Sequence, residues 1–296
     1  MLKPPRWAVI SLILGLLSAI GTMVCWGISP IIYKVLVLKH GATTTNFVRL
    51  TLTSIILAVL MLFEDLSSLN LYTLILVAIV AIFAHGIADT LFIKSIGTGG
   101  ASYAVPLAYT YILFVSLFAV VLFNEPLTLQ LVLGSIITFL GITIMSLEKS
   151  STRVKIRSLL LSTLAAITWT IAILVLKVSM SYLSPMLIVE LKAILMVPLF
   201  IPYLKLTNKF NEIKKFTIRE LSLALASGVI ALIFGSLFYV YTIMYIGVAY
   251  ATISTTGSML VTQFLSSTVS KEHLTLNRIV GAVVIAIGVS LPFIQF

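Results

Sequence analysis

The chain repeats one pattern of apolar segments and polar landmarks in its two halves, and this repeat limits the folds open to it. A tryptophan, a lysine and a further basic residue recur at the same spacings, first as Trp26, Lys34 and Arg49 and then as Trp169, Lys177 and Lys192. A Glu-x-Leu-Thr motif followed by two glycines also recurs, at 125–141 and 272–288. Each copy spans an odd number of hydrophobic segments, so the second copy crosses a membrane in the opposite direction. Inverted repeats are typical of carriers that open alternately to the two sides of a bilayer.

The composition excludes an ordinary soluble domain. Hydrophobic residues make up 60% of the 296 residues and charged residues only 9%, whereas soluble domains are typically about 45–50% apolar and about 25% charged. So few charges could not cover the surface of a water-soluble protein of this length. The net charge of +10 comes from Lys and Arg residues between the hydrophobic runs. That placement is typical of loops that contact anionic membrane lipids, and it argues against a nucleic-acid partner.

Ten segments are predicted to be transmembrane helices, because a helix needs roughly 20 mostly apolar residues to span a bilayer. The runs are continuous and lack the alternation of a transmembrane strand. We therefore predict an all-α, multi-pass protein of the plasma membrane, with a first five-helix repeat over 1–149 and an inverted second repeat over 150–296. The predicted helices are 8–38, 44–63, 70–95, 100–122, 127–147, 157–181, 184–204, 218–245, 248–269 and 275–294.

Basic residues are unevenly divided between the two faces of the predicted bundle. The N-terminus carries Lys3 and Arg6, and the opposite face carries most of the others. Cytoplasmic loops are enriched in Lys and Arg, so this division predicts that links 148–157 and 205–220 are cytoplasmic and that both termini are outside. The basic residues assigned to the cytoplasmic face are Lys39, Lys149, Arg153, Lys155, Arg157, Lys205, Lys209, Lys214, Lys215, Arg219, Lys271 and Arg278.

The sequence contains no motif for metal or enzymatic chemistry. His40, His85 and His273 lie in separate segments, and Cys25 is the single cysteine, so neither a zinc site nor an internal disulfide is predicted. The glycine-rich stretch 97–100 lacks the Lys-Ser/Thr ending of a phosphate-binding loop. We predict no catalytic residues, no metal and no cofactor.

Ionisable residues inside spanning segments are the first candidates for a functional site, because each is costly to insert and needs a reason. In the third segment His85 and Asp89 lie four residues apart and share one face. Arg49 and Lys94 are predicted at the same membrane side and are further partners for Asp89. In the second half the corresponding charges lie toward the opposite face because the repeat is inverted; they are Lys177, Glu190 and Lys192.

Two readings of these charges stay open. Arg49, Lys94 and Lys177 could form charge clusters or gates at the two mouths of a cavity, or they could extend to the headgroups from helix ends. Aromatic and amide side chains in mid-helix add to the candidate site, because a buried hydroxyl or amide needs a partner. The predicted substrate-binding residues are Trp26, His85, Asp89, Tyr109, Tyr111, Trp169, Glu190, Lys192, Tyr239 and Gln263.

Taken together, these residues resemble the drug/metabolite transporter superfamily, specifically its ten-helix EamA-type members, over nearly the whole chain. Trp26-Gly27 with Lys34 and Arg49 resembles the start of each EamA repeat, and the two Glu-x-Leu-Thr stretches resemble its end. The resemblance implies a 5+5 inverted-repeat carrier of small metabolites, often an exporter of amino acids. It implies a central substrate site, with helices five and ten supporting the fold or pairing subunits in a homodimer.

The chain departs from the family pattern at three places. Thr110-Tyr111 and Gly257-Ser258 stand where the family often has a Glu-Pro pair, and Thr170 follows Trp169 in place of a glycine. The resemblance also implies cytoplasmic termini, whereas the loop charges predict the reverse. The orientation, and with it the direction of transport, stays open between these two.

We predict a secondary transporter that exports a small-molecule substrate, such as an amino acid, by alternating access. Coupling to protons through Asp89, His85 or Glu190 is one option, and uncoupled transport is the other. Multidrug efflux is the main alternative, since an aromatic-rich cavity suits it equally. A membrane enzyme acting on lipids is less favoured because no catalytic set gathers at an interface, and a non-transporting scaffold is a further alternative.

Overall fold

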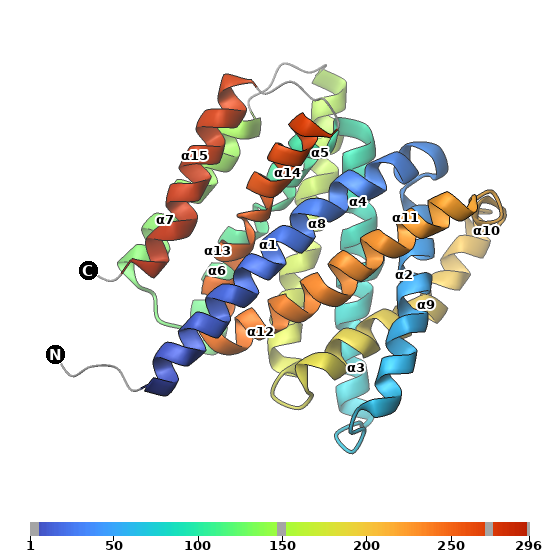
Figure 1. The fold of residues 1–296 in the computed structure, drawn as a ribbon, viewed down its shortest axis with the longest axis horizontal. Coiled ribbons are helices and arrows are strands. Elements are labelled where there is room, and N and C mark those ends of the chain that lie inside the picture. Colours follow the sequence, from blue (N-terminus) through green and yellow to red (C-terminus); the bar gives the residue numbers. More distant parts are fainter. Residues whose placement is uncertain (1–5, 147–151, 270–274, 295–296) are drawn as a thin grey trace.

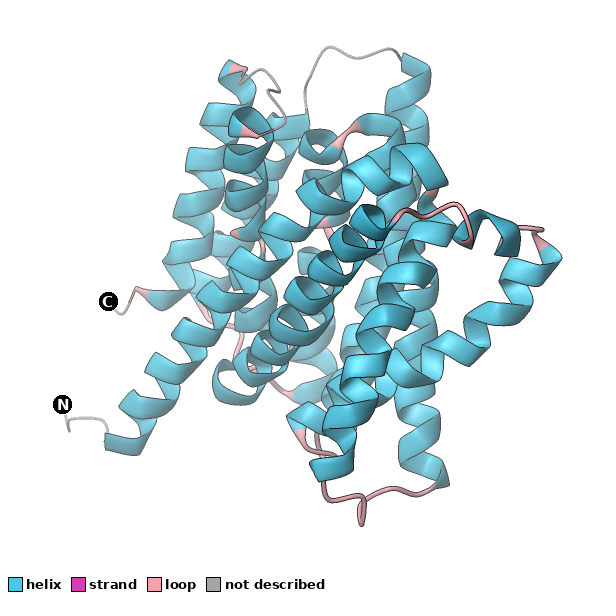
Figure 2. Cartoon of the chain, turned by 45° about the vertical axis from the view of Figure 1, so that its right-hand side comes forward, coloured by secondary structure: helices cyan, strands magenta, loops and turns pink. Residues whose placement is uncertain are grey.

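The computed structural model describes residues 6–146, 152–269 and 275–294. Within these ranges all regular secondary structure is helical, and short loops join the helices into one bundle (Figures 1 and 2). The predicted all-α architecture is confirmed. The first half contains α1 (Arg6–His40), α2 (Ala42–Leu60), η1 (Met61–Phe63), α3 (Leu71–Val80), η2 (Ala81–Ala88), α4 (Asp89–Gly99), α5 (Ala101–Ala108), α6 (Tyr111–Phe123) and α7 (Leu129–Ser146). The second half contains α8 (Thr152–Ser179), α9 (Pro185–Leu206), α10 (Phe210–Ile213), α11 (Ile218–Gly228), η3 (Val229–Gly235), α12 (Ser236–Ile246), α13 (Val248–Thr255), α14 (Ser258–Thr268), α15 (Leu276–Ser290) and η4 (Leu291–Phe293).

Most of the predicted segments are long and apolar enough in the structure to cross a membrane. The described residues contain 8 such stretches, and α7 is a shorter apolar helix over Leu129–Met145. The predicted segment 248–269 is divided between α13 and α14. The 8 stretches are Ile10–His40, Ala42–Phe63, Leu71–Gly99, Tyr103–Phe123, Ile156–Ser179, Pro185–Leu206, Ile218–Ile246 and Leu276–Phe293.

Equivalent helices of the two halves run in opposite directions. In Figure 1, α1 rises from the lower left to the upper right, whereas its counterpart α8 descends from the top of the bundle to the bottom. The same holds for α2, which descends, and α9, which rises. The architecture is therefore one of duplicated halves with opposed chain directions.

The third helix of each half begins in the same way. Asn70 and Thr73 form a reciprocal capping box at the start of α3, and Thr217 and Glu220 form one at the start of α11. Such a box satisfies two backbone N–H groups that a helix leaves unpaired. Both helices then pass through a π-helical turn, η2 and η3 respectively. Asp89 follows Asn70 at the same spacing at which Ser236 follows Thr217, so these two residues are equivalent.

A glycine in the left-handed region ends this third helix in both halves, Gly100 with φ 80° and Gly247 with φ 87°. Only glycine adopts this conformation without strain. After Gly247, the Glu125 carboxylate of the other half caps the start of α13, accepting from the backbone N–H of Val248 at 2.6 Å and of Ala249 at 2.8 Å. The repeated glutamate motif thus joins the two halves through a helix N-terminus, where negative charge is stabilising.

The fourth and ninth segments differ from their predicted form, because each is two helices instead of one. A turn at Tyr109-Thr110 separates α5 from α6, and a turn at Thr256-Gly257 separates α13 from α14. Pro106, one turn before the first break, cannot donate a helical hydrogen bond. Gly257 lowers the helix propensity at the second break. Both breaks fall where the chain departs from the EamA-type Glu-Pro pattern.

Helices α7 and α15 pack closely against each other through glycines. A Cβ added at Gly141 would lie 2.8 Å from the carbonyl oxygen of Gly281, and one added at Gly288 would lie 2.8 Å from that of Gly134. Real Cβ atoms essentially never approach backbone oxygens this closely. These glycines therefore allow the backbones of the two helices to approach each other closely.

Candidate functional site

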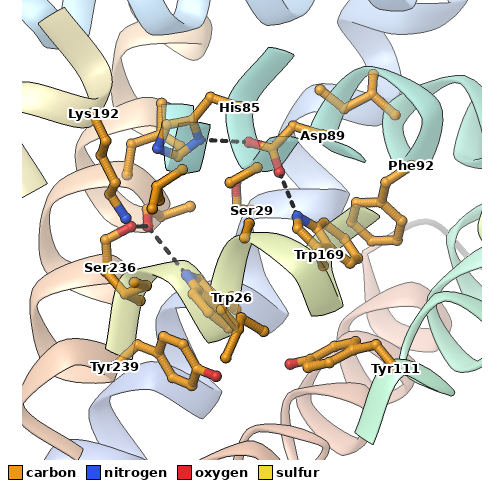
Figure 3. Close-up of a pocket in the computed structure, with 18 of the residues that line it drawn as sticks. Trp26, Ser29, His85, Asp89, Phe92, Tyr111, Trp169, Lys192, Ser236 and Tyr239 are labelled. Carbon is orange, nitrogen blue, oxygen red and sulfur yellow. Dashed lines mark hydrogen bonds and ion pairs between the residues drawn. The ribbon is translucent and has the colours of Figure 1, made fainter. Parts of the chain in front are cut away.

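A cavity of about 110 Å³ lies among helices of both halves, and Figure 3 shows the side chains that line it. Side chains from both halves form its wall, so no single repeat makes the site. Nine of the predicted site residues line the cavity. Five of them lie in the first half, in α1, α2, η2, α4 and α6, and three lie in the second half, in α8, α9 and α12. The ninth, Tyr109, lies in the turn between α5 and α6. These predicted residues are Trp26, Arg49, His85, Asp89, Tyr111, Trp169, Lys192, Tyr239 and Tyr109.

Asp89 is the centre of a charged cluster on one wall of the cavity. The Nδ1 atom of His85 lies 3.0 Å from its Oδ2, and the Nη2 atom of Arg49 lies 3.8 Å from the same oxygen. Trp169 Nε1 donates to the other carboxylate oxygen at 3.2 Å. Arg49 also lies over the Tyr33 ring, 5.0 Å from its centroid, in cation–π geometry. The Asp89 carboxylate is therefore already neutralised and hydrogen-bonded by the protein.

Aromatic rings form a second wall of the cavity. Trp26 and Tyr239 lie with ring centroids 4.9 Å apart, Tyr109 and Tyr111 lie 5.5 Å apart, and Tyr111 and Trp169 lie 5.8 Å apart. The Nε1 of Trp26 donates to the carbonyl oxygen of Ala231 at 3.2 Å. Both indole donors are thus used within the protein, and the rings offer their apolar faces to the cavity.

Hydroxyl groups of α13 and α14 fix the tyrosines of this wall. The Tyr111 hydroxyl lies 2.9 Å from the Thr255 hydroxyl, and that of Tyr239 lies 3.2 Å from that of Thr252. Ser258 donates to the Tyr109 hydroxyl at 2.6 Å. The Ser/Thr-rich ninth segment therefore supports the cavity wall from behind.

Four predicted residues do not line this cavity. Glu190 is completely buried in α9, and its carboxylate has no hydrogen-bond partner among the described residues. It lies two residues from Lys192, and positions two apart do not share a helix face. Gln263 is buried in α14 outside the cavity wall. Lys94 is exposed and Lys177 is half-buried, which fits lysines that extend to headgroups.

Sequence reasoning missed several residues of the wall, including Ser29, Tyr33, Phe92 and Ser236. Ser29 and Tyr33 follow Trp26 by three and seven residues, which is the spacing of one helix face. Once Trp26 is assigned to the cavity, this spacing predicts that Ser29 and Tyr33 line it as well. Phe92 contacts Trp169 edge-on at 5.0 Å between centroids, a contact between distant segments.

Membrane-spanning helices in duplicated halves around a central cavity define the chain as a multi-pass membrane protein of the carrier type. The EamA-like transporter family matches residues 13–147 and again 156–294. The chain belongs to this family, within the drug/metabolite transporter superfamily, and is accordingly a membrane transporter and not an enzyme.

Two individual proteins are similar to this chain. It is 28% identical over 204 residues to an uncharacterized transporter of Archaeoglobus fulgidus, a match that covers 68% of this chain and 70% of the relative. Its fold is similar to that of a protein with a crystal structure, with a TM-score of 0.70, 13% identity, and 94% of this chain and 96% of the other covered. The second likeness concerns the fold alone.

Proposed function

We propose that the chain is a secondary transporter of small metabolites that binds its substrate in the central cavity and works by alternating access. The observation that carries this proposal is the cavity itself, which lies between the two halves and combines charged and aromatic side chains from both. Ligand sites are typically concave and mostly apolar with a few convergent polar groups.

The size of the cavity favours a small metabolite over a bulky drug. Its volume is about 110 Å³, whereas an engineered cavity of about 150 Å³ holds one benzene molecule. In this conformation the site therefore has room for a compact solute. Multidrug efflux would need a much larger space, since drug-sized pockets are about 300–1,000 Å³.

Contacts between the halves at both ends of the bundle support alternating access. Where α1 ends, the Nζ of Lys39 donates to Glu220 at 2.6 Å, and His40 stacks on Phe216 with centroids 3.8 Å apart. At the opposite end, Tyr72 and Tyr182 meet edge-on. We take the contacts at these two ends as the gates that open in turn, in place of the predicted gate residues Lys94 and Lys177.

Transport in proteoliposomes is the test of this proposal. Purified protein is reconstituted, and counterflow of radiolabelled small acids, amines, amino acids and neutral solutes is compared with that of bulky cationic dyes. We expect saturable transport of at least one compact solute, which protein-free liposomes lack. Preferential transport of the dyes would favour the multidrug alternative.

Proton coupling, export and pairing of subunits remain parts of the proposal. Asp89 is engaged by His85, Arg49 and Trp169, so Glu190, buried and without a hydrogen-bond partner in the described structure, is the better candidate for carrying a proton. Transport by wild type and Glu190→Gln with and without a pH gradient separates coupled from uncoupled transport. Inside-out vesicles give its direction, and mass measurement in detergent gives the number of subunits.

A further inference from the structure

Each half of the protein brings one basic side chain to the cavity from an equivalent position. Arg49 in α2 and Lys192 in α9 occupy the same place in the repeated pattern, and both line the cavity. Arg49 is 3% exposed and Lys192 is 6% exposed. A buried cation needs a counter-charge, because its transfer out of water without one is very costly.

The two halves differ in what faces this basic side chain. In the first half, the Nη2 of Arg49 lies 3.8 Å from the Asp89 carboxylate. In the second half, the residue equivalent to Asp89 is Ser236, which also lines the cavity but carries no charge. Figure 3 shows Lys192 reaching across the cavity wall toward Ser236. The counter-charge present in one half is therefore missing from the other.

Among the described residues, Asp89 is the acidic group whose charge acts on Lys192, but no ion pair joins the two. Within the part of the chain that the structure describes, Lys192 makes no hydrogen bond and no ion pair. Asp89, the acidic residue of the cavity wall, is already held by His85, Arg49 and Trp169. Apart from the tyrosines, which are neutral when protonated, the ionisable groups of the wall are Arg49, Lys192, Asp89 and His85, so with His85 neutral the cavity carries one positive charge in excess.

We propose that the substrate supplies this missing charge, and that the transported solute is a compact monocarboxylate whose carboxylate pairs with Lys192 and whose apolar body lies against the aromatic wall. The proposal rests on the proposed transport function and narrows its substrate class. A net charge of −1 is favoured over a zwitterion, because the ammonium of an amino acid would find the Asp89 carboxylate occupied. The Ser236 hydroxyl lines the same cavity and donates to the carbonyl oxygen of Ala231 at 3.4 Å, so the charge for the carboxylate comes from Lys192.

A ligand comparison on the wild-type protein gives the first test. Binding of 3-methylbutanoate, its uncharged isostere 3-methylbutanamide, 3-methylbutylamine and leucine is followed at pH 7 by quenching of indole fluorescence in the full-length, detergent-purified chain. We expect the acid to bind at least about tenfold more tightly than the amide, since charge-assisted hydrogen bonds are roughly twice as strong as neutral ones. Equal binding of acid and amide, or tighter binding of leucine or the amine, would overturn the proposal.

Substitutions in α9 then test whether Lys192 causes the preference for the acid over the amide. Lys192→Met should bring the ratio of acid to amide affinity close to one, and Lys192→Arg should retain most of it. Lys205→Met is the matched control, because Lys205 lies on the same helix but is exposed, and it should bind like wild type. If Lys192→Met unfolds, the ratio of acid to amide affinity in wild type and in Lys192→Arg tests the proposal instead. A wild-type ratio in Lys192→Met that remains folded would contradict the proposal.

The same panel in the counterflow assay separates this proposal from the transport function on which it rests. If neutral or cationic solutes are transported and carboxylates are not, only the substrate class is wrong. If no solute of any charge is transported, the transport function fails, and binding of the acid alone would then describe a receptor site.

Discussion

The contacts of Asp89 indicate that this residue stabilises the fold. Its side chain is 14% exposed, and its carboxylate is held by an imidazole, a guanidinium and an indole N–H. Asp89→Asn should lower the stability by about 3 kcal/mol, because removing one partner of a buried ion pair leaves the other charge uncompensated. The measurement is thermal unfolding in detergent.

The control for this change is Asp65→Asn in the exposed link between α2 and α3, where Asp65 accepts hydrogen bonds from the backbone and side chain of Ser67. It should leave the unfolding temperature unchanged. Removing the opposing charge in the double variant Arg49→Gln with Asp89→Asn should restore part of the lost stability. An Asp89→Asn protein as stable as wild type would show that the pair contributes nothing.

The two cavity tryptophans are equivalent in the repeat, but their substitution by phenylalanine should change the transport KM by different amounts. Trp169 donates to a carboxylate and Trp26 to a backbone carbonyl. Hydrogen bonds to charged groups contribute about 1.5–3 kcal/mol against about 0.5–1.5 for neutral ones. Trp169→Phe should therefore raise the transport KM more than Trp26→Phe does. Equal KM values in both variants would mean that the ring faces, and not the indole donors, determine affinity.

At the scale of elements, the cap on α13 is a testable link between the halves. Glu125 accepts from two backbone N–H groups at the start of this helix. Glu125→Gln removes the charge and should destabilise the helix start by about 1 kcal/mol. Faster amide hydrogen exchange over 248–251 measures this, with Glu212→Gln in the exposed pair with Lys215 as the control. Unchanged exchange over 248–251 would contradict the cap's contribution.

The apolar segments and their duplication were predictable because hydrophobic length and spacing are local properties of a sequence. The cap formed by Glu125 was not, since its partners Val248 and Ala249 are far away in the chain. The breaks at Tyr109-Thr110 and Thr256-Gly257 were also missed. Pro106 and Gly257 mark these places, but a single proline or glycine inside a helical pattern does not by itself establish that the helix ends there.

Residues of the candidate site were predictable where a single polar side chain in an apolar segment indicates which helix face points inward. Trp26, Asp89 and Trp169 line the cavity as expected from their polar atoms in apolar segments. Glu190 does not, because α9 is apolar on all sides and its hydrophobic pattern gives no indication of which face is inward. Choosing Lys192 as inward-facing would have excluded Glu190, two residues away, from the same face.

For the whole molecule, the first question is which end of the bundle faces the cytoplasm. Helix α10 lies at the end of the bundle where α1 terminates (Figure 1), and its sequence is flanked by Lys209, Lys214 and Lys215. A cysteine at the exposed Asn211, in a Cys25→Ser background, should react with an impermeant maleimide only after cells are permeabilised. Ready labelling of intact cells would support cytoplasmic termini instead. The link 148–157, predicted on the same side, lies partly outside the described residues.

The second question is whether the two end contacts act as gates. A reporter cysteine at Ser29, which lines the cavity and is 2% exposed, is again placed in the Cys25→Ser background. Glu220→Gln should speed its modification from the basic face, because the variant loses the ion pair with Lys39. Tyr182→Ala should speed it from the other face. Lys215→Gln is the control, and equal rates in all variants would contradict a gating role.

The uncompensated charge at Lys192 affects how the membrane voltage drives the transport cycle. If the solute is a monoanion, the loaded site is neutral and the empty site carries one positive charge. The membrane voltage then acts only on the empty carrier, with about 2.3 kcal/mol per 100 mV for a charge that crosses the whole field. A negative interior draws the empty site inward and leaves the loaded site free to move outward. Voltage alone would then drive the carrier as an exporter, without any coupled ion.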